Sequence, residues 1–284
     1  MRHRFPFFAL ILFLCGCVTG PSSVPKAGPV NTAVLPTNKN NKPGPKIQTP
    51  SKSTNSGNPI EYPEVLGVDD IVVHEGYTSS YNHETLCPNW VAYELTVEEA
   101  NGKMKGKESF QWDPQLKGRQ SNREDYKNDQ QWDKGHLAPK ADMKWSVKAY
   151  EESFFLTNIC PQNRAFNGGI WLSTEKLARR SAEKYGKVYI VSGPIFTERK
   201  FGTLGTSRVA IPDKFYKALL IPKGDTYSAI AFVLDNAPGN SSLKTSSMSV
   251  DSLETLIGRD LFHNLDDEIE LIVESKVWYV DWSL

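Results

Sequence analysis

Short runs of alternating hydrophobic and polar residues recur between residues 61 and 284, and such runs are typical of β-strands. The clearest of these runs cover residues 88–96, 186–196 and 227–234. A fourth run, at 209–222, is separated from the run at 227–234 by a turn-forming Lys-Gly-Asp sequence. The pattern therefore predicts four strands, two of which follow each other across a short turn.

Other hydrophobic positions repeat at helical spacing. This spacing predicts helices over residues 147–154, 168–185 and 250–258, and a further strand over 154–159. Ser146 and Ser249 directly precede the first and third helix, where a serine side chain can cap the free backbone N–H groups. Strands and helices follow one another without regular alternation, which predicts an α/β domain with a mixed sheet.

The amino terminus has a different pattern. Arg2 and Arg4 precede an apolar run at residues 5–15 that is too short to span a bilayer, which is typical of an export signal. The run ends in Leu-Cys-Gly-Cys, which resembles a bacterial lipoprotein box. We therefore expect residues 1–16 to be a signal peptide and Cys17 to be lipidated. An ordinary secretory signal or a short membrane anchor is the alternative.

Residues 17–60 are rich in Pro, Asn, Ser, Lys, Thr and Gly and hold few large apolar side chains. Such a segment cannot bury enough surface to fold. A flexible coil of this length has an end-to-end distance of roughly 35 Å. We expect it to tether a domain formed by residues 61–284 to the membrane of a bacterial cell envelope, on the periplasmic side or at the cell surface.

Charge does not by itself indicate a partner. The chain has 33 basic and 33 acidic residues, and residues 1–60 hold seven Lys or Arg and no acid. The remaining 26 basic and 33 acidic residues give residues 61–284 a net charge of −7. A strongly basic nucleic-acid binder is therefore excluded, and any affinity for nucleic acid must come from a local patch.

With Cys15 removed and Cys17 acylated, only Cys87 and Cys160 remain, so a single disulfide is possible. Export would permit this bond. Two separately buried thiols are the alternative.

Polar residues with catalytic potential occur at two places. The sequence Asp-Lys-Gly-His-Leu-Ala-Pro, at 133–139, contains His136. In the helix predicted over 168–185, residues spaced four apart lie along one side, starting just before the helix: Asn167, Trp171, Glu175 and Arg179. One face of this helix is expected to pack while the adjacent edge presents amide, carboxylate and guanidinium groups together.

These motifs, in this order, resemble the DNA/RNA non-specific endonucleases, which include mitochondrial endonuclease G. The motifs are D-x-G-H-L-A-P, then T-N-x-x-P-Q, then N-x-x-x-W-x-x-x-E-x-x-x-R, and the similarity covers roughly residues 70–265. D-x-G-H alone would be a weak signal, but the combination is specific. The resemblance implies an α+β fold whose mixed, mainly antiparallel sheet is flanked by helices and carries a ββα-metal motif.

The resemblance also implies a role for each residue. His136 is the expected general base, because a neutral imidazole can accept a proton at pH 7. Asn167 is the expected ligand of a divalent cation, Mg²⁺ or another such as Mn²⁺. Glu175 would orient water at the ion, Asn158 would support the site, and Arg179 would face the phosphate.

Lys134 departs from the family, which usually has arginine there. A lysine cannot make the bidentate phosphate contact of a guanidinium, so weaker activity or looser binding is expected. A second family arginine lies upstream of the histidine, and Arg119 and Arg123 are the nearest candidates. A structural histidine, a helix cap at Asn167 and a surface ion pair between Glu175 and Arg179 are the alternatives without catalysis.

The sequence therefore predicts a lipid-anchored enzyme that hydrolyses DNA and RNA with little sequence preference. We expect binding to depend on Lys134, Lys140, Lys144, Arg164 and Arg179 together with the ion, and to weaken with salt. One alternative is a catalytically weak nuclease fold that binds nucleic acid or another polyanion without cutting it. Another is a structural lipoprotein whose aromatic residues only fill a core.

Overall fold

The computed structural model describes residues 59–127, 129–198, 200–239 and 242–284. The predicted signal peptide, Cys17 and all but the last two residues of the predicted tether lie outside these ranges. In the part of the chain that is described, no helix is both long and apolar enough to cross a membrane.

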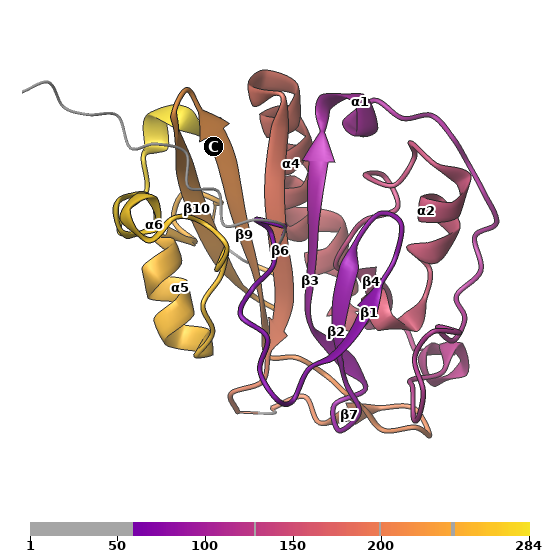
Figure 1. Ribbon diagram of the computed structural model, residues 1–284. Coiled ribbons are helices and arrows are strands. Elements are labelled where there is room, and N and C mark those ends of the chain that lie inside the picture. The colour runs from indigo at the N-terminus through magenta and orange to yellow at the C-terminus, as the bar shows by residue number, and fades with distance from the viewer. Residues whose placement is uncertain (1–58, 128, 199, 240–241) are drawn as a thin grey trace, which may run out of the picture. The chain divides into compact units, whose positions relative to one another are not determined.

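A seven-stranded sheet forms the centre of the fold (Figure 1), and every pair of neighbouring strands in it is antiparallel. In spatial order the strands are β1 (Asp70–Val73), β2 (Thr78–Asn82), β3 (Cys87–Thr96), β6 (Lys187–Ile195), β9 (Lys214–Lys223), β10 (Thr226–Asp235) and β11 (Ser247–Met248). The spatial order follows the chain order throughout, and the strands that lie between β3 and β6 and between β6 and β9 in the chain form two separate two-stranded sheets.

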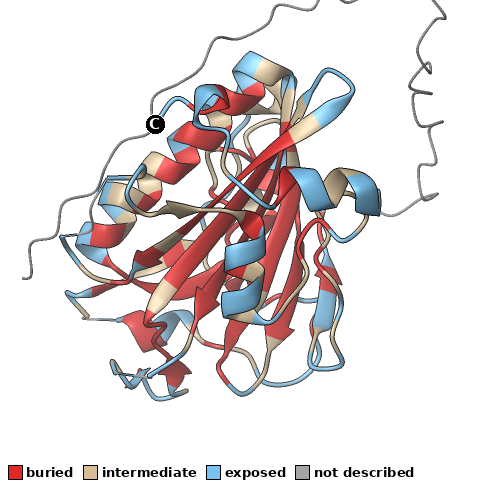
Figure 2. Cartoon of the chain, turned by 90° about the vertical axis from the view of Figure 1, so that its left-hand side faces the viewer, coloured by how far each residue is buried: buried red, intermediate tan, exposed pale blue. Residues whose placement is uncertain are grey.

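Helices cover both faces of this sheet, and alternate residues of each strand point to opposite layers. On β9, Leu219 belongs to the hydrophobic cluster that contains Leu177 of α4 (Leu172–Tyr185). The next residue, Leu220, belongs to the cluster that contains Leu253 of α5 (Val250–Ile257). Helix α6 (Asp267–Val273) packs beside α5 through Val273, and Figure 2 shows the strands buried between the two layers.

The smaller elements lie mostly between β3 and β6. They are the two-stranded sheet of β4 (Trp132–His136) and β5 (Ile159–Asn163), and the helices α1 (Val97–Ala100), α2 (Val147–Glu152) and α3 (Arg164–Phe166). Short β7 (Thr203–Leu204) and β8 (Val209–Ala210) pair with each other after β6. Single 3₁₀ turns occur at Arg123–Tyr126, Leu156–Asn158 and Tyr279–Asp281.

The predicted α+β class with a mainly antiparallel sheet is confirmed, with corrections to single elements. The strand predicted at 154–159 is wrong, because that stretch is mostly a 3₁₀ turn and the strand β5 begins at Ile159. The strand predicted at 209–222 is two strands, β8 and β9. Asp213 interrupts it, because its carboxylate accepts backbone N–H bonds from Thr197, Glu198 and Lys200.

Candidate active site

Two strands and the following helices bring the predicted residues together. Strands β4 and β5 pair antiparallel, with His136 opposite Ile159 and Trp132 opposite Asn163. The chain then continues from β5 into α3, a single π-helical stretch at Asn167–Trp171, and α4. This order of two strands and helix is the ββα arrangement that the sequence predicts.

His136 ends β4 inside an aromatic pocket. Its ring centre lies 5.6 Å from that of Phe110 and 5.2 Å from that of Phe154, which meets it edge-on. Its Nε2 atom is shielded from solvent and has no hydrogen-bond partner among the described residues. Burial lowers the pKa of His136 to about 4, the charge of Lys140 lowers it further, and Glu108 opposes both. The imidazole is therefore neutral at pH 7, with a nitrogen free to accept a proton.

Asn158 holds the turn that follows His136. Its Oδ1 accepts the backbone N–H of Ala138, and its Nδ2 donates to the carbonyl groups of Ala138 and Ser153, each at 2.8 Å. The backbone N–H of Leu137 adds a bond to the Asn158 carbonyl. Both ends of this buried amide are therefore engaged in holding the turn directly after His136.

Asn167 lies beside the other end of β4. Its Nδ2 is 3.4 Å from Oδ2 of Asp133, whose Oδ1 accepts a bond from Nε of Arg164 at 3.0 Å. Four residues further on, the Trp171 indole N–H donates to the His136 carbonyl at 3.1 Å. The segment 167–171 is thus bonded to β4 at both Asp133 and His136. These bonds hold Asn167, the predicted metal ligand, beside the strand that carries His136, the predicted base.

The donor set at this place fits a hard divalent cation. Asn167 and Asp133 are both partly exposed, and between them they present an amide and a carboxylate, whose oxygens are the ligands that Mg²⁺ prefers. In the described part of the chain, the side-chain oxygen of Asn167 accepts no hydrogen bond. Asn167 is also not the N-cap of the helix, since Asn163 accepts the backbone N–H groups of Ala165 and Phe166.

Glu175 and Arg179 belong to a buried network on α4. Arg179 donates to Asp142 at 2.5 Å, and Asp142 also accepts the Tyr93 hydroxyl at 2.7 Å. Burial raises the pKa of Glu175 to about 7, although the positive charge of Lys217 opposes this shift. Since the carboxylate partner of Arg179 is Asp142, the alternative of a surface ion pair between Glu175 and Arg179 is wrong.

Lys134 is held by aromatic rings. Its Nζ atom lies 5.3 Å from the ring centres of both Phe110 and Tyr126, and no carboxylate of the described residues is within ion-pair distance. By contrast, Lys140 is paired with Glu108 and Arg164 with Asp133. The charge of Lys134 is therefore the more available one for a phosphate.

A cleft lies beside His136 and Lys134. Phe110, Trp112, Asn122 and Arg123 are among the residues that line it, and Phe110 is also the ring in contact with His136. Arg119 instead donates to the backbone carbonyl of Ser207. Of the two upstream arginine candidates, Arg123 is therefore the one close to the site.

Comparison with known proteins agrees with this geometry. The profile of the family described as DNA/RNA non-specific endonuclease matches residues 56–268. The chain belongs to this family. The predicted family and enzyme class, an endonuclease, are thereby confirmed.

Individual members of the family are similar over much of the described domain. The mitochondrial nuclease EXOG of Danio rerio is 33% identical over 58% of this chain and 52% of its own length. Human mitochondrial endonuclease G is 30% identical over 61% of this chain and 62% of its own length. The matches thus cover a little over half of these relatives.

The fold is shared with a solved structure. A chain in the crystal structure of the EndoG/EndoGI complex has a TM-score of 0.65 to this one and is 24% identical, covering 72% of this chain and 89% of that one. This likeness supports the endonuclease fold, including its mainly antiparallel sheet.

Two buried polar residues beside the candidate site carry no role in the sequence-based prediction. Gln162 is buried on β5, and neither its Oε1 nor its Nε2 has a partner among the described residues. It packs against Gly135, where a Cβ atom would lie 2.1 Å from the amide carbon. Lys217 is buried on β9, with its Nζ 4.3 Å from the ring centre of Trp171. For Lys217 the sequence did offer a signal, because a lysine stands inside an otherwise hydrophobic strand.

The expected disulfide is not formed in the structure. Cys87 and Cys160 are free and buried. The two side chains are neighbours. Burial and a hydrogen bond to Cys87 raise the pKa of the Cys160 thiol. Both thiols are free here, as the alternative expects, and a disulfide between these two neighbours stays a prediction.

Proposed function

We propose that this chain hydrolyses phosphodiester bonds of DNA and RNA without sequence preference, using His136 as the general base. The single observation that carries the proposal is the unpartnered, shielded Nε2 of a neutral His136 at the end of the ββα motif. In-line attack on phosphorus needs a group that takes a proton from water, and a neutral imidazole does this at pH 7.

The residues around His136 keep it ready for this step. Phe110 and Phe154 exclude bulk water from one side of the ring and favour its neutral form. Asn158 fixes the following turn, and Trp171 fixes the backbone carbonyl of His136 itself. The base is therefore oriented before substrate arrives, which lowers the entropic cost of the reaction.

Asn167, with Asp133 beside it, would hold the divalent cation, which we propose to be Mg²⁺ or Mn²⁺. The ion supplies positive charge for the phosphoryl oxygens and the leaving oxygen. Glu175, with a pKa of about 7, is able to accept or release a proton near neutral pH. We propose that it orients water between the ion and the phosphate.

Substrate contacts are proposed for Lys134, whose charge is unpaired, and for Arg179 at the edge of the buried network. Trp112 has 61% of its surface exposed and lines the adjoining cleft with Arg123, where a base can stack on the indole. Contacts to phosphate and to a π-face carry no sequence information, which accounts for the lack of preference.

We further propose that the enzyme is exported and held at the membrane of a bacterial cell envelope by a lipid on Cys17. The support is the charged start, the apolar run and the Leu-Cys-Gly-Cys sequence of residues 1–17. The relatives compared above are named as mitochondrial, so the location of this chain is a question separate from its family.

The test is digestion of supercoiled plasmid and of RNA with and without Mg²⁺. We expect both polymers to be shortened only with the ion, and His136→Ala to lower turnover by roughly 10²- to 10⁴-fold, as loss of a general base does. His83→Ala is the matched control, because His83 is a partly exposed histidine bonded to the Asp70 carboxylate and the Arg119 backbone carbonyl. Wild-type digestion by His136→Ala, or a gel shift without shortening, would refute the proposal.

A further inference from the structure

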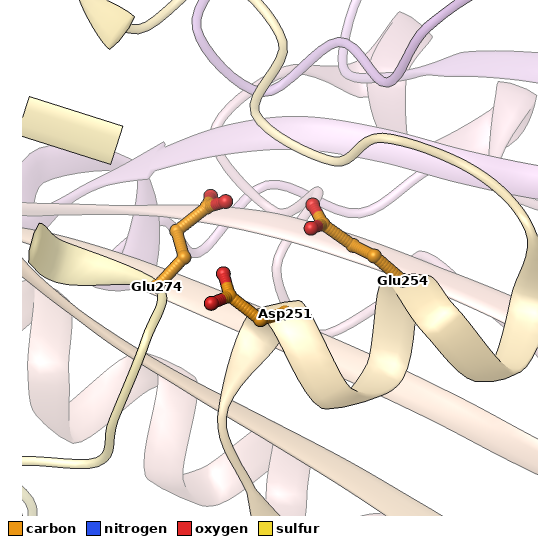
Figure 3. Close-up of side chains that lie close together, drawn as sticks. All are labelled: Asp251, Glu254 and Glu274. Atoms are coloured by element: carbon orange, nitrogen blue, oxygen red, sulfur yellow. The ribbon is translucent and has the colours of Figure 1, made fainter. Parts of the chain in front are cut away.

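Three acidic side chains converge far from His136 in the chain. Asp251 and Glu254 lie one turn apart on α5, and Glu274 directly follows α6. One carboxylate oxygen from each lies within 4.8 Å of the other two, and among the described residues they form a group whose atoms could hold a metal ion. Figure 3 shows the three carboxylates pointing toward one another.

Glu274 points to a missing partner in this cluster. Only 1% of its surface is exposed, and its Oε1 has no hydrogen-bond partner among the described residues. Leaving a buried carboxylate oxygen unsatisfied is costly, so such atoms normally meet a donor, a water or a cation. The Glu274 carboxylate is one of the three that face one another in this group (Figure 3).

The surroundings add negative charge without compensation. Asp260 and Glu270 act electrostatically on Glu274, and no lysine or arginine of the described chain forms an ion pair with Asp251, Glu254 or Glu274. Arg259, the nearest arginine in sequence, is bonded to Asp69, and His263 is bonded to Asp260. The three carboxylates thus lie together with no positively charged partner among the described residues, and a bound cation would supply the missing positive charge.

We propose that Asp251, Glu254 and Glu274 bind a calcium ion. All three supply hard oxygen ligands, as Ca²⁺ requires. Mg²⁺ keeps most of its waters and is usually bound by one or two carboxylates, whereas Ca²⁺ takes more oxygen ligands in a flexible geometry. A group of three carboxylates therefore favours calcium.

Backbone contacts fix the geometry of the site. Oε1 of Glu254 accepts the backbone N–H of Leu261 at 2.7 Å, which leaves its second oxygen for the ion. The backbone N–H of Asp251 donates to the Glu274 carbonyl at 3.3 Å, which joins the start of α5 to the end of α6. An ion bound by Asp251, Glu254 and Glu274 would be a second link between the start of α5 and the end of α6.

The calcium site would stabilise the fold and take no part in hydrolysis. Helices α5 and α6 pack on the hydrophobic cluster that lies on one face of the main sheet, and Trp171 and Leu137 beside His136 belong to the cluster on the other face. The sheet thus separates the two ion sites. We expect Ca²⁺ to raise the thermal stability of the chain without replacing the catalytic ion.

The first test uses the native full-length protein stripped with a chelator and kept in excess Mg²⁺. We expect radioactive Ca²⁺ to bind at one ion per chain. At 100-fold excess over its dissociation constant, Ca²⁺ should raise the unfolding temperature by roughly 5–10 °C. Absence of bound Ca²⁺ under these conditions would overturn the proposal.

The second test compares variants. Glu254→Gln/Glu274→Gln keeps the size of both side chains and should abolish the Ca²⁺-dependent rise in unfolding temperature. Glu268→Gln, an exposed acid of α6, should retain it, as should Asn167→Ala at the proposed catalytic ion site. If the double variant is more stable than the native chain in chelator and Ca²⁺ stabilises neither, Glu254 and Glu274 share a proton and the calcium site does not exist.

Discussion

The indole N–H of Trp171 donates to the backbone carbonyl of His136 at 3.1 Å. This bond connects the π-helical stretch that carries Asn167 to the strand that carries the proposed base. Trp171 is fully buried and also covers the Nζ atom of Lys217, so the ring is held in place from both sides. Trp171 thus fills the core and also holds the segment that carries Asn167 beside the strand that carries His136.

Trp171→Phe should therefore weaken both stability and catalysis. The partly buried His136 carbonyl loses a donor, which costs about 1–2 kcal/mol, and the unfolding temperature should fall by about 2–8 °C. Turnover should fall about tenfold, because small displacements of catalytic groups are costly. Both are measured by thermal unfolding and plasmid digestion.

Trp282→Phe is the matched control for that experiment. Trp282 is also buried, but its Nε1 has no partner among the described residues, so the same substitution removes ring area without removing a hydrogen bond. We expect its turnover to stay within about twofold of the native value. Equal losses of turnover in the two variants would show that the bond to His136 has no role in positioning.

The order of the motifs was sufficient to name His136 and Asn167 as members of one candidate site, and the structure brings their segments together, although the strand β4 that carries His136 was not predicted. The sequence was not sufficient for Arg179. Spacing along one helix suggested Glu175 as its neighbour, whereas its actual partner, Asp142, lies 37 residues away in sequence. Ion pairs between segments depend on tertiary packing, which spacing within one helix does not report.

Strands β1 and β2 were missed for a related reason. Ser79 and Ser80 are buried in β2 although both are polar. Each finds a partner elsewhere in the chain, Ser79 at the carbonyl of Thr157 and Ser80 at the carboxylate of Asp69. A hydrophobicity pattern records only apolar burial and cannot register polar groups that are satisfied by distant residues.

The lowered pKa of His136 predicts acid sensitivity. Its pKa is about 4 in the folded chain and about 6.5 when unfolded, so between these values the unfolded chain binds more protons. The stability linked to His136 is complete above pH 6.5 and is lost as the pH falls toward 4. His136→Gln should remove this dependence.

Urea unfolding at pH 7 and pH 4.5 measures the effect. On lowering the pH, the native chain should lose about 2 kcal/mol more than His136→Gln. Carboxylates titrate in both proteins, so the difference isolates the histidine. The same loss in both proteins would mean that His136 is protonated in the fold at pH 4.5.

Asn167→Ala tests the proposed ligand of the catalytic ion. Removing the amide oxygen should raise the Mg²⁺ concentration for half-maximal digestion by at least about tenfold, with most activity recovered at saturating Mg²⁺. Asn101→Ala is the control, because among the described residues this exposed amide donates to the Val97 carbonyl and to no other group. An unchanged Mg²⁺ titration for Asn167→Ala would remove Asn167 from the site.

Lys134 offers a direct test of phosphate binding. Since its charge is held between Phe110 and Tyr126 without a carboxylate, each phosphate that it neutralises releases counterions from the polymer. Lys134→Ala should weaken binding equally for all sequences and reduce the slope of log affinity against log salt by about 1. Lys127→Ala, at an exposed lysine paired with Glu124, should leave the slope unchanged.

Lys134→Arg restores the residue that is usual in the family. A guanidinium can stack on the rings of Phe110 and Tyr126 and still offer two parallel donors to one phosphate, which an ammonium cannot do. We expect KM for plasmid to fall about threefold to tenfold while kcat changes little, because the contact is made to the ground state and the transition state alike. Steady-state digestion of the two proteins, with Lys127→Arg as control, measures this. A KM that is unchanged or higher would mean that Lys134 does not contact the phosphate in this enzyme.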